Sequence, residues 1–154
     1  IKFIFLGSGA DEENLKVTAK KWNLDNVLFV PRVVSSEVTK YLNAADFLLV
    51  HLKKNELFKI TIPSKILAYL KTGKPILMGL EGDAKDILVN AQAGYTFEPD
   101  NSEDLEQQIK KMMLLSNEEI EKMGQLGKAY YKNNLSMESS VDKLERNLKN
   151  IINN

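Results

Sequence analysis

The sequence has no cysteine, and among its 154 residues it has a single histidine and a single tryptophan. The absence of cysteine excludes disulfide bonds and thiolate chemistry, and it is compatible with a cytoplasmic protein. One histidine without an accompanying acidic cluster cannot form a metal centre. We therefore expect no metal site and no other cofactor.

The sequence also lacks a charge surplus and a long apolar run. Its 21 lysines and arginines balance 21 aspartates and glutamates, whereas proteins that bind duplex nucleic acid usually carry a basic surplus. No apolar run approaches the roughly 18 residues that span a membrane. The opening IKFIFLGSGA has too short an apolar part and no basic leader for a signal peptide. Because it begins without methionine inside a strand-like run, we expect an upstream part of the protein.

Short apolar runs alternate with longer amphipathic ones along the chain. Hydrophobic residues make up 44% of the sequence, enough for a sizeable core in one α/β domain. The apolar runs predict strands buried on both faces at 2–7, 26–30, 46–52, 74–80 and 94–99. The amphipathic runs predict helices at 11–22, 35–43, 63–72, 83–92, 102–115, 117–132 and 136–152.

Repeated strand–helix units predict the fold class. They indicate an α/β protein with a parallel, doubly wound, Rossmann-like sheet, helices on both faces and a helical carboxyl-terminal tail. No internal repeat, low-complexity tract or long linker divides the chain, so we expect one domain over residues 1–154. Ligands bind such sheets beyond the carboxyl ends of the strands. The turns after the predicted strands are therefore the candidate sites.

The first of these turns is Gly7-Ser8-Gly9. Small residues allow backbone N–H groups to approach a phosphate at a helix start. A dinucleotide fingerprint requires a further glycine at position 12, where this sequence has Glu12. The turn therefore has two interpretations, as a ligand contact and as an ordinary tight connection.

A stronger candidate is Thr61-Ile62-Pro63-Ser64-Lys65, which opens the predicted helix over 63–72. Pro63 suits a first helical turn because its missing N–H has no helical partner there. The free N–H groups of that turn, together with the helix dipole, form an anion site. Ser64 adds a hydroxyl donor and Lys65 a positive charge. The alternative is a structural helix with a solvated lysine.

Two features follow the third predicted strand. His51 lies at its carboxyl end, where acid–base chemistry is conceivable, but a hydrogen-bonded histidine at the edge of a cleft is the plainer interpretation. The polar segment over 53–59, which includes Lys53 and Glu56, has the length and polarity of many functional loops. Its alternative is a solvated connector.

Three stretches occur in an order that is typical of one family. Residues 1–50 contain the G-x-G turn, the run LDNVLFV and an Ala-Asp pair before a buried strand. PSKILAYLKTGKPIL and GDAKDILVNAQAGYTFEPDNSEDL follow it, at 63–77 and 82–105. Together these stretches resemble the donor-binding, carboxyl-terminal half of group 1 glycosyltransferases (family four, GT-B fold). The stretch ITIPSK at 60–65 most resembles the corresponding stretch of transferases that transfer amino-deoxy sugars such as N-acetylfucosamine into surface polysaccharides.

The resemblance implies a bacterial enzyme with two Rossmann-like domains. An amino-terminal domain, absent from this chain, would hold the acceptor, and the present domain would hold a nucleoside-diphosphate sugar, UDP in preference to GDP. The reaction implied is hexosyl or deoxyhexosyl transfer with retention of configuration, and the isolated domain would be inactive. The implied location is the cytoplasm, at the inner face of the membrane through the missing domain.

The family's site residues transfer onto particular positions of this sequence. The resemblance places Gly7, Ser8 and Gly9 beside the donor and assigns backbone groups near the nucleobase to Pro31, Arg32 and Val33. It assigns contacts with the pyrophosphate or sugar to Thr61, Ile62, Ser64 and Lys65. Further candidates are His51, Lys53 and Glu56. No residue is assigned as catalytic.

One departure from the family concerns a pair of glutamates eight residues apart. Alignment on the Gly-Lys-Pro at 73–75 places Ile60 and Ala68 at these two positions. An alanine cannot accept hydrogen bonds from the ribose hydroxyls, so ribose recognition must differ here. Glu56 in the preceding loop is a candidate substitute; the alternatives are an impaired enzyme and a subgroup that functions without these carboxylates.

Two other functions stay open at this stage. One is a non-catalytic, nucleotide-binding regulatory module, and the other is half of a UDP-amino-sugar epimerase, which would need acid–base carboxylates in its cleft. A receiver domain of the response-regulator type is disfavoured because no acidic cluster ends the first strand. In the family, the last helices brace the partner domain, so we expect exposed apolar patches over 117–152 and self-association of the isolated chain.

Overall fold

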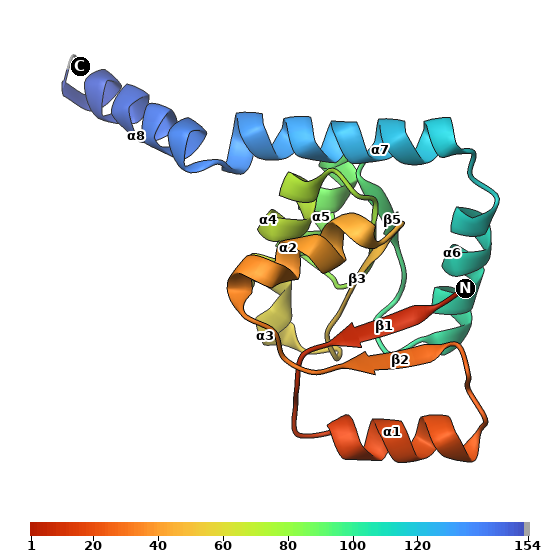
Figure 1. The fold of residues 1–154 in the computed structure, drawn as a ribbon. Helices are drawn as coiled ribbons and strands as arrows, with labels where there is room; N and C mark the ends of the chain where they lie inside the picture. Colours follow the sequence, from red (N-terminus) through yellow and green to blue (C-terminus); the bar gives the residue numbers. More distant parts are fainter. Residues whose placement is uncertain (153–154) are drawn as a thin grey trace. The chain divides into compact units, whose positions relative to one another are not determined.

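The computed structural model describes residues 1–152 (Figure 1). The chain divides into two compact units, the first over Ile1–Tyr41 and the second from Leu42 onward. Both units contain parallel strands connected by helices, so the predicted α/β class is confirmed. The five predicted strands form a two-stranded sheet in the first unit and a three-stranded sheet in the second. One domain over the whole chain stays a prediction.

The first unit is a strand–helix–strand motif. Strand β1 (Phe3–Leu6) pairs in parallel with β2 (Val27–Val30), and helix α1 (Glu12–Lys21) connects them. Helix α2 (Ser35–Ala44) begins in this unit and ends just beyond its boundary. No residue of 1–41 is fully buried. This unit therefore does not form a closed hydrophobic core of its own.

The second unit is built on three parallel strands in the order β3 (Leu48–His51), β4 (Ile76–Gly79) and β5 (Gly94–Thr96). Strand β4 lies in the centre, and all four of its residues are buried. A central strand of a parallel sheet is covered on both faces, which explains the uninterrupted apolar run PILMGL in the sequence. The core of the protein is therefore in this unit.

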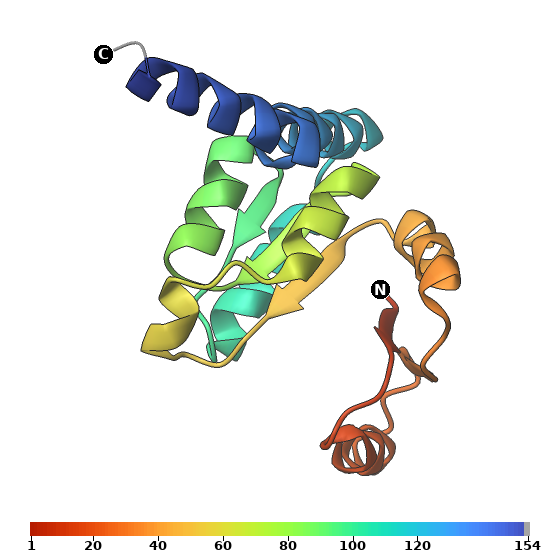
Figure 2. The ribbon, with the colours of Figure 1, turned by 90° about the vertical axis from the view of Figure 1, so that its left-hand side faces the viewer.

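Helices cover both faces of this sheet. Helices α4 (Ser64–Thr72) and α5 (Asp83–Ala91) pack on the face that carries Ile76 and Met78. Helix α6 (Ser102–Met113) packs on the opposite face, against Leu77. The alternation of neighbouring β4 side chains between two apolar clusters follows from the two-residue period of a strand. Figure 2 shows the three helices around the sheet.

The chain ends in a helical tail, as predicted. Helix α7 (Asn117–Tyr130) packs on α4 and α5. It begins at the predicted residue, Asn117, and a capping box between Ser116 and Glu119 closes its amino-terminal end. A five-residue π-helical turn over Tyr131–Leu135 then leads to α8 (Met137–Ile152), which extends away from the sheet of this unit (Figure 1).

Candidate functional site

The candidate site of the second unit lies at the carboxyl ends of its strands. The connection after β3 covers residues 52–63 and leads into α4. It contains one turn of helix, α3 (Glu56–Lys59). The sequence predicts a polar loop or a solvated connector for this segment. The Asn55 side chain caps this turn by accepting from the Leu57 N–H at 2.9 Å. Thr61 then donates its hydroxyl back to the Leu57 carbonyl at 2.7 Å.

Helix α4 opens with free backbone donors. Pro63 has an extended conformation with ψ 134° and precedes the first helical residue, Ser64. Ile66 donates to the Pro63 carbonyl at 3.0 Å, whereas the N–H groups of Ser64 and Lys65 have no acceptor within residues 1–152. Both residues are exposed, and no carboxylate pairs with Lys65 in that part of the chain. Two free N–H groups, the helix dipole and an unpaired cation together favour an anion.

Ala68 lies one helical turn after Ser64 on the exposed surface of α4. The neighbouring Ile66 and Leu70 point into the core and are fully buried. The position that the family resemblance assigns to a ribose-binding glutamate therefore faces outward, on the same face of the helix as the Ser64 side chain. The helix closes at Gly73, whose φ of 72° is left-handed.

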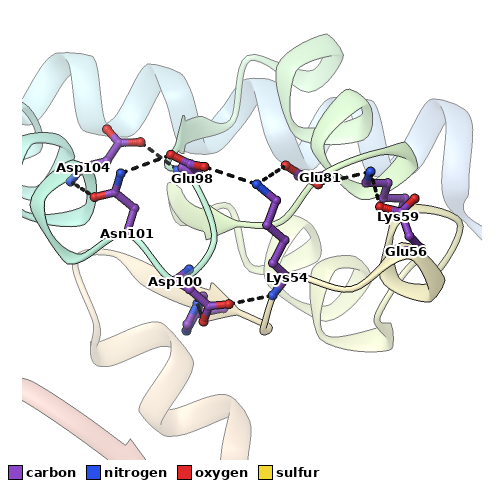
Figure 3. A network of polar contacts seen from close by, with 9 residues as sticks. Lys54, Glu56, Lys59, Glu81, Glu98, Asp100, Asn101 and Asp104 are labelled. Carbon is purple, nitrogen blue, oxygen red and sulfur yellow. Dashed lines mark hydrogen bonds and ion pairs between the residues drawn. The ribbon is translucent and has the colours of Figure 1, made fainter.

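Lys54 connects three loops at the carboxyl edge of the sheet (Figure 3). Its backbone N–H donates to Asp100 Oδ2 at 2.8 Å, and its ammonium donates to Glu98 Oε1 at 3.3 Å. The same ammonium lies 3.7 Å from Glu81 Oε1. Glu98 and Asp100 belong to the loop after β5, and Glu81 belongs to the loop after β4. Lys54 thereby joins the ends of all three strands.

Lys59 makes a second connection to the loop after β4. Its ammonium lies 2.6 Å from Glu56 Oε1 and 3.7 Å from Glu81 Oε2. Hydrogen bonding to Glu56 is the main reason why the pKa of Lys59 lies above its usual value. Glu56, a candidate substitute for ribose recognition, is thus paired with a lysine on its own helical turn. A ribose contact by Glu56 stays a prediction.

Glu98, in the loop after β5, and Asp104, in the first turn of α6, are held as carboxylates. The side-chain amide of Asn101 donates to Glu98 and, together with Lys54, lowers the pKa of the Glu98 carboxyl. Asp104 accepts from Gln108 and from the Glu98 backbone N–H, and these bonds lower the pKa of Asp104. Hydrogen bonds to the ionised form have this effect. Neither carboxyl is a proton donor at neutral pH.

His51 is hydrogen-bonded at the edge of this network. The backbone N–H of Asp100 donates to His51 Nε2 at 3.2 Å, and Asp100 Oδ1 lies 3.6 Å from the same atom. The His51 ring contacts the Phe97 ring, with centroids 5.7 Å apart. A side chain at Gly79, the partner of His51 in the strand register, would collide with both rings. These contacts are those of the plainer interpretation, a hydrogen-bonded histidine.

In the first unit, two candidate segments lie at the same end of the small sheet. Leu6 pairs with Val30, and the turns Gly7–Gly9 and Pro31–Val33 follow these two residues directly. The Gly7 N–H donates to the Val30 carbonyl at 3.0 Å, and its φ of 129° favours glycine. The sheet therefore brings these two turns together. Their contacts with a donor stay a prediction.

Comparison with known proteins identifies the family. The family model for glycosyl transferases of group 1 matches residues 1–133. The chain belongs to this family. The matched part of the chain includes β1 to β5 and the three candidate segments at residues 7–9, 31–33 and 61–65, and it ends within the π-helical turn. A comparison with curated proteins found no match.

Solved structures confirm the fold. The Anabaena protein Alr3699/HepE in complex with UDP matches 97% of this chain and 41% of its own, with a TM-score of 0.80 and 14% sequence identity. A glycosyltransferase from Rickettsia africae matches 100% of this chain and 41% of its own, with a TM-score of 0.73 and 19% sequence identity. The carboxyl-terminal domain of the group 1 glycosyl transferase family protein LpcC from Francisella tularensis matches 84% of this chain and 66% of its own, with a TM-score of 0.67 and 18% sequence identity.

This chain thus spans about two fifths of the first two of these structures, and its fold is one half of a GT-B glycosyltransferase. In the described part of the chain, no helix is both long and apolar enough to span a membrane. Residues 1–152 also contain no group of three or more acidic or histidine side chains that could hold a metal ion.

Lys54, Glu98 and Asp100 are not among the site residues assigned from the sequence. Lys54 and Asp100 follow predicted buried strands, and Glu98 lies at the end of the strand predicted over 94–99, so their strand-end positions were a usable signal. What the sequence could not indicate is their pairing, because parallel strands bring together residues that are 44 and 46 positions apart.

Proposed function

We propose that this chain is the donor-binding domain of a retaining glycosyltransferase, and that it binds a nucleoside-diphosphate sugar. The observation that carries the proposal is the start of α4, where the N–H groups of Ser64 and Lys65 are free and the lysine is unpaired. A diphosphate carries two adjacent anionic groups and matches such a site. Thr61 and Ile62 precede it and contact the pyrophosphate or the sugar.

Uridine is the proposed base, in preference to guanosine. Alr3699/HepE has been solved with UDP and with UDP-glucose, and the chain shares its fold. In the proposal, the Gly7–Gly9 turn borders the donor, and backbone groups of Pro31, Arg32 and Val33 lie by the base. Lys53 and His51 are further candidate contacts at the edge of the site.

The proposed chemistry needs no nucleophile from this chain. As the bond between the sugar and the diphosphate breaks, negative charge grows on the leaving phosphate. Fixed N–H donors and the Lys65 ammonium stabilise that charge more in the transition state than in the ground state, which lowers the barrier. The acceptor hydroxyl comes from a second, amino-terminal domain, so the isolated chain binds nucleotide but transfers no sugar.

The finer assignment concerns the sugar and the cellular role. The ITIPSK stretch supports a hexosyl or deoxyhexosyl group of the N-acetylfucosamine type, transferred during bacterial surface polysaccharide synthesis. The corresponding location is the cytoplasm, with membrane attachment through the amino-terminal domain. WaaG, a glycosyltransferase involved in lipopolysaccharide biosynthesis, shares the fold with 16% identity.

Isothermal titration of the chain with UDP, UDP-sugars, UMP and GDP tests the proposal. We expect UDP to bind more tightly than GDP, and Lys65→Ala to weaken UDP binding about tenfold. Because UMP carries less negative charge than UDP, Lys65→Ala should weaken UMP binding less. Lys71→Ala, which removes an exposed lysine from the far end of the same helix, is the matched control and should change nothing.

Three outcomes would decide against the proposal. The absence of binding at millimolar nucleotide contradicts both a transferase domain and a regulatory nucleotide module. Equal affinity for all diphosphates favours the regulatory module. Conversion of a UDP-amino sugar to its epimer by the chain would favour the epimerase.

A further inference from the structure

We propose that Lys54 is a positioning residue, whose contacts with the loops after β4 and β5 hold the connection that presents the α4 donors. The inference rests on the proposed function, because it assigns to Lys54 the arrangement of that same site. It also separates Lys54 from Lys65, although both are exposed lysines in the same region.

Residues 53–62 of the connection have few other polar attachments. Hydrogen bonds and ion pairs that join residues 53–62 to the rest of the described chain all involve Lys54 or Lys59. The other polar contacts of this connection, from Asn55 and Thr61, stay within it. The polar contacts that fix residues 53–62 relative to the strand ends therefore come from these two lysines.

Lys54 is held on two sides by groups of opposite charge. Glu98 and Glu81 approach its ammonium at 3.3 Å and 3.7 Å, and Asp100 accepts its backbone N–H at 2.8 Å. These two carboxylates offset the positive charge of the Lys54 ammonium, so it attracts a phosphate less than the unpaired Lys65 does. Figure 3 shows Lys54 between these side chains.

The connection transmits the position of Lys54 to α4. Asn55 caps α3 directly after Lys54, and Thr61 donates back to the carbonyl of Leu57. Only Ile62 and Pro63 then separate this turn from Ser64. A displacement of the turn therefore moves the two free N–H groups. Donors that are no longer held in place must be ordered on binding, which lowers the affinity for the ligand.

Amide hydrogen exchange of the chain without ligand tests the positioning itself. We expect Lys54→Met, which keeps the apolar stem and removes the charge, to speed exchange over residues 55–62 several-fold, because these amides then open more readily. Lys54→Arg should restore the slower exchange. Lys53→Ala is the matched control, since its exposed side chain makes no ion pair within residues 1–152.

UDP titration at several salt concentrations tests the effect on the site. The double variant Lys54→Met/Glu98→Gln removes the ion pairs of Lys54 with Glu98 and Glu81 without changing net charge. We expect it to weaken UDP binding by up to about fivefold and to leave the salt dependence of Kd unchanged. Lys65→Ala should flatten that dependence, because it removes a direct contact between charges.

Two results would overturn the inference. One is unchanged exchange over residues 55–62 in Lys54→Met. The other is a double variant whose UDP binding loses its salt dependence as fully as that of Lys65→Ala, which would make Lys54 a phosphate ligand. If the unmodified chain binds no nucleotide, the proposed function fails, and the exchange measurement alone still decides whether Lys54 positions the connection.

Discussion

Gly82 lies against the backbone carbonyl of Lys59. A Cβ atom at position 82 would be 2.0 Å from the Lys59 oxygen, and the φ of Gly82 is +69°. The loop after β4 can therefore approach the end of α3 only because position 82 has no side chain. This close approach brings the neighbouring Glu81 within reach of both Lys54 and Lys59.

Gly82→Ala should destabilise the protein. A left-handed alanine costs about 1–3 kcal/mol, and the collision with a backbone atom adds a similar amount. We expect the free energy of unfolding in urea to fall by at least about 2 kcal/mol. Gly9→Ala is the control, because a Cβ there would meet nothing within 4 Å. A Gly82→Ala protein as stable as the control would contradict the described contact.

The lowered pKa of Glu98 predicts a dependence of stability on pH. The unfolded chain binds a proton at the ordinary pKa of 4.5, and the folded protein binds it only at lower pH. Stability from Glu98 is therefore complete above the ordinary value and is lost as pH falls through the lowered folded pKa. Urea unfolding of the unmodified protein and Glu98→Gln, from pH about 6 to about 3, should give a difference that shrinks with acid. A difference independent of pH would contradict this assignment.

Ala68→Glu should increase the affinity for UDP. The new carboxylate would stand on the exposed surface of α4, one turn from Ser64, where the family resemblance places a ribose-binding glutamate. Charged hydrogen bonds to the ribose hydroxyls are expected to tighten binding about tenfold. UDP without the two ribose hydroxyls should show no gain. An equal gain for both nucleotides would show that the carboxylate acts elsewhere.

Helix α8 should mediate self-association of the isolated chain. Met137, Val141, Leu144, Leu148 and Ile151 follow one another at spacings of four and three residues, and each is at least 50% exposed. Such a stripe favours packing against another helix. Sedimentation should detect association that Leu144→Glu/Leu148→Glu abolishes, whereas Arg146→Glu on the opposite side of the helix should not. A chain that stays monomeric at all concentrations would contradict the prediction.

The element boundaries were predictable because apolar periodicity differs between strands and helices. All five strands and the seven longer helices lie where the sequence places them, within a few residues. Helix α3 was not predicted, because its four residues are too few to show a helical period. The π-helical turn at Tyr131–Leu135 likewise has no apolar pattern that separates it from the helices on either side.

The candidate site was predictable only in part. The free donors at Ser64 and Lys65 follow from a local rule about helix starts, and the structure has them as expected. The contacts of Lys54 with Glu98 and Asp100 depend on strand order, which no local pattern encodes. His51 was located correctly at the end of β3, but its bond to the Asp100 N–H required the fold.

The most direct test of the account is to map UDP onto the chain by backbone NMR. We expect the amide resonances of Ser64 and Lys65 to shift on addition of UDP, with saturation at the same concentration, because the diphosphate accepts hydrogen bonds from these two N–H groups. Lys71, at the other end of the same helix, should not shift. Saturable UDP binding that leaves the Ser64 and Lys65 amides unchanged would contradict the central claim.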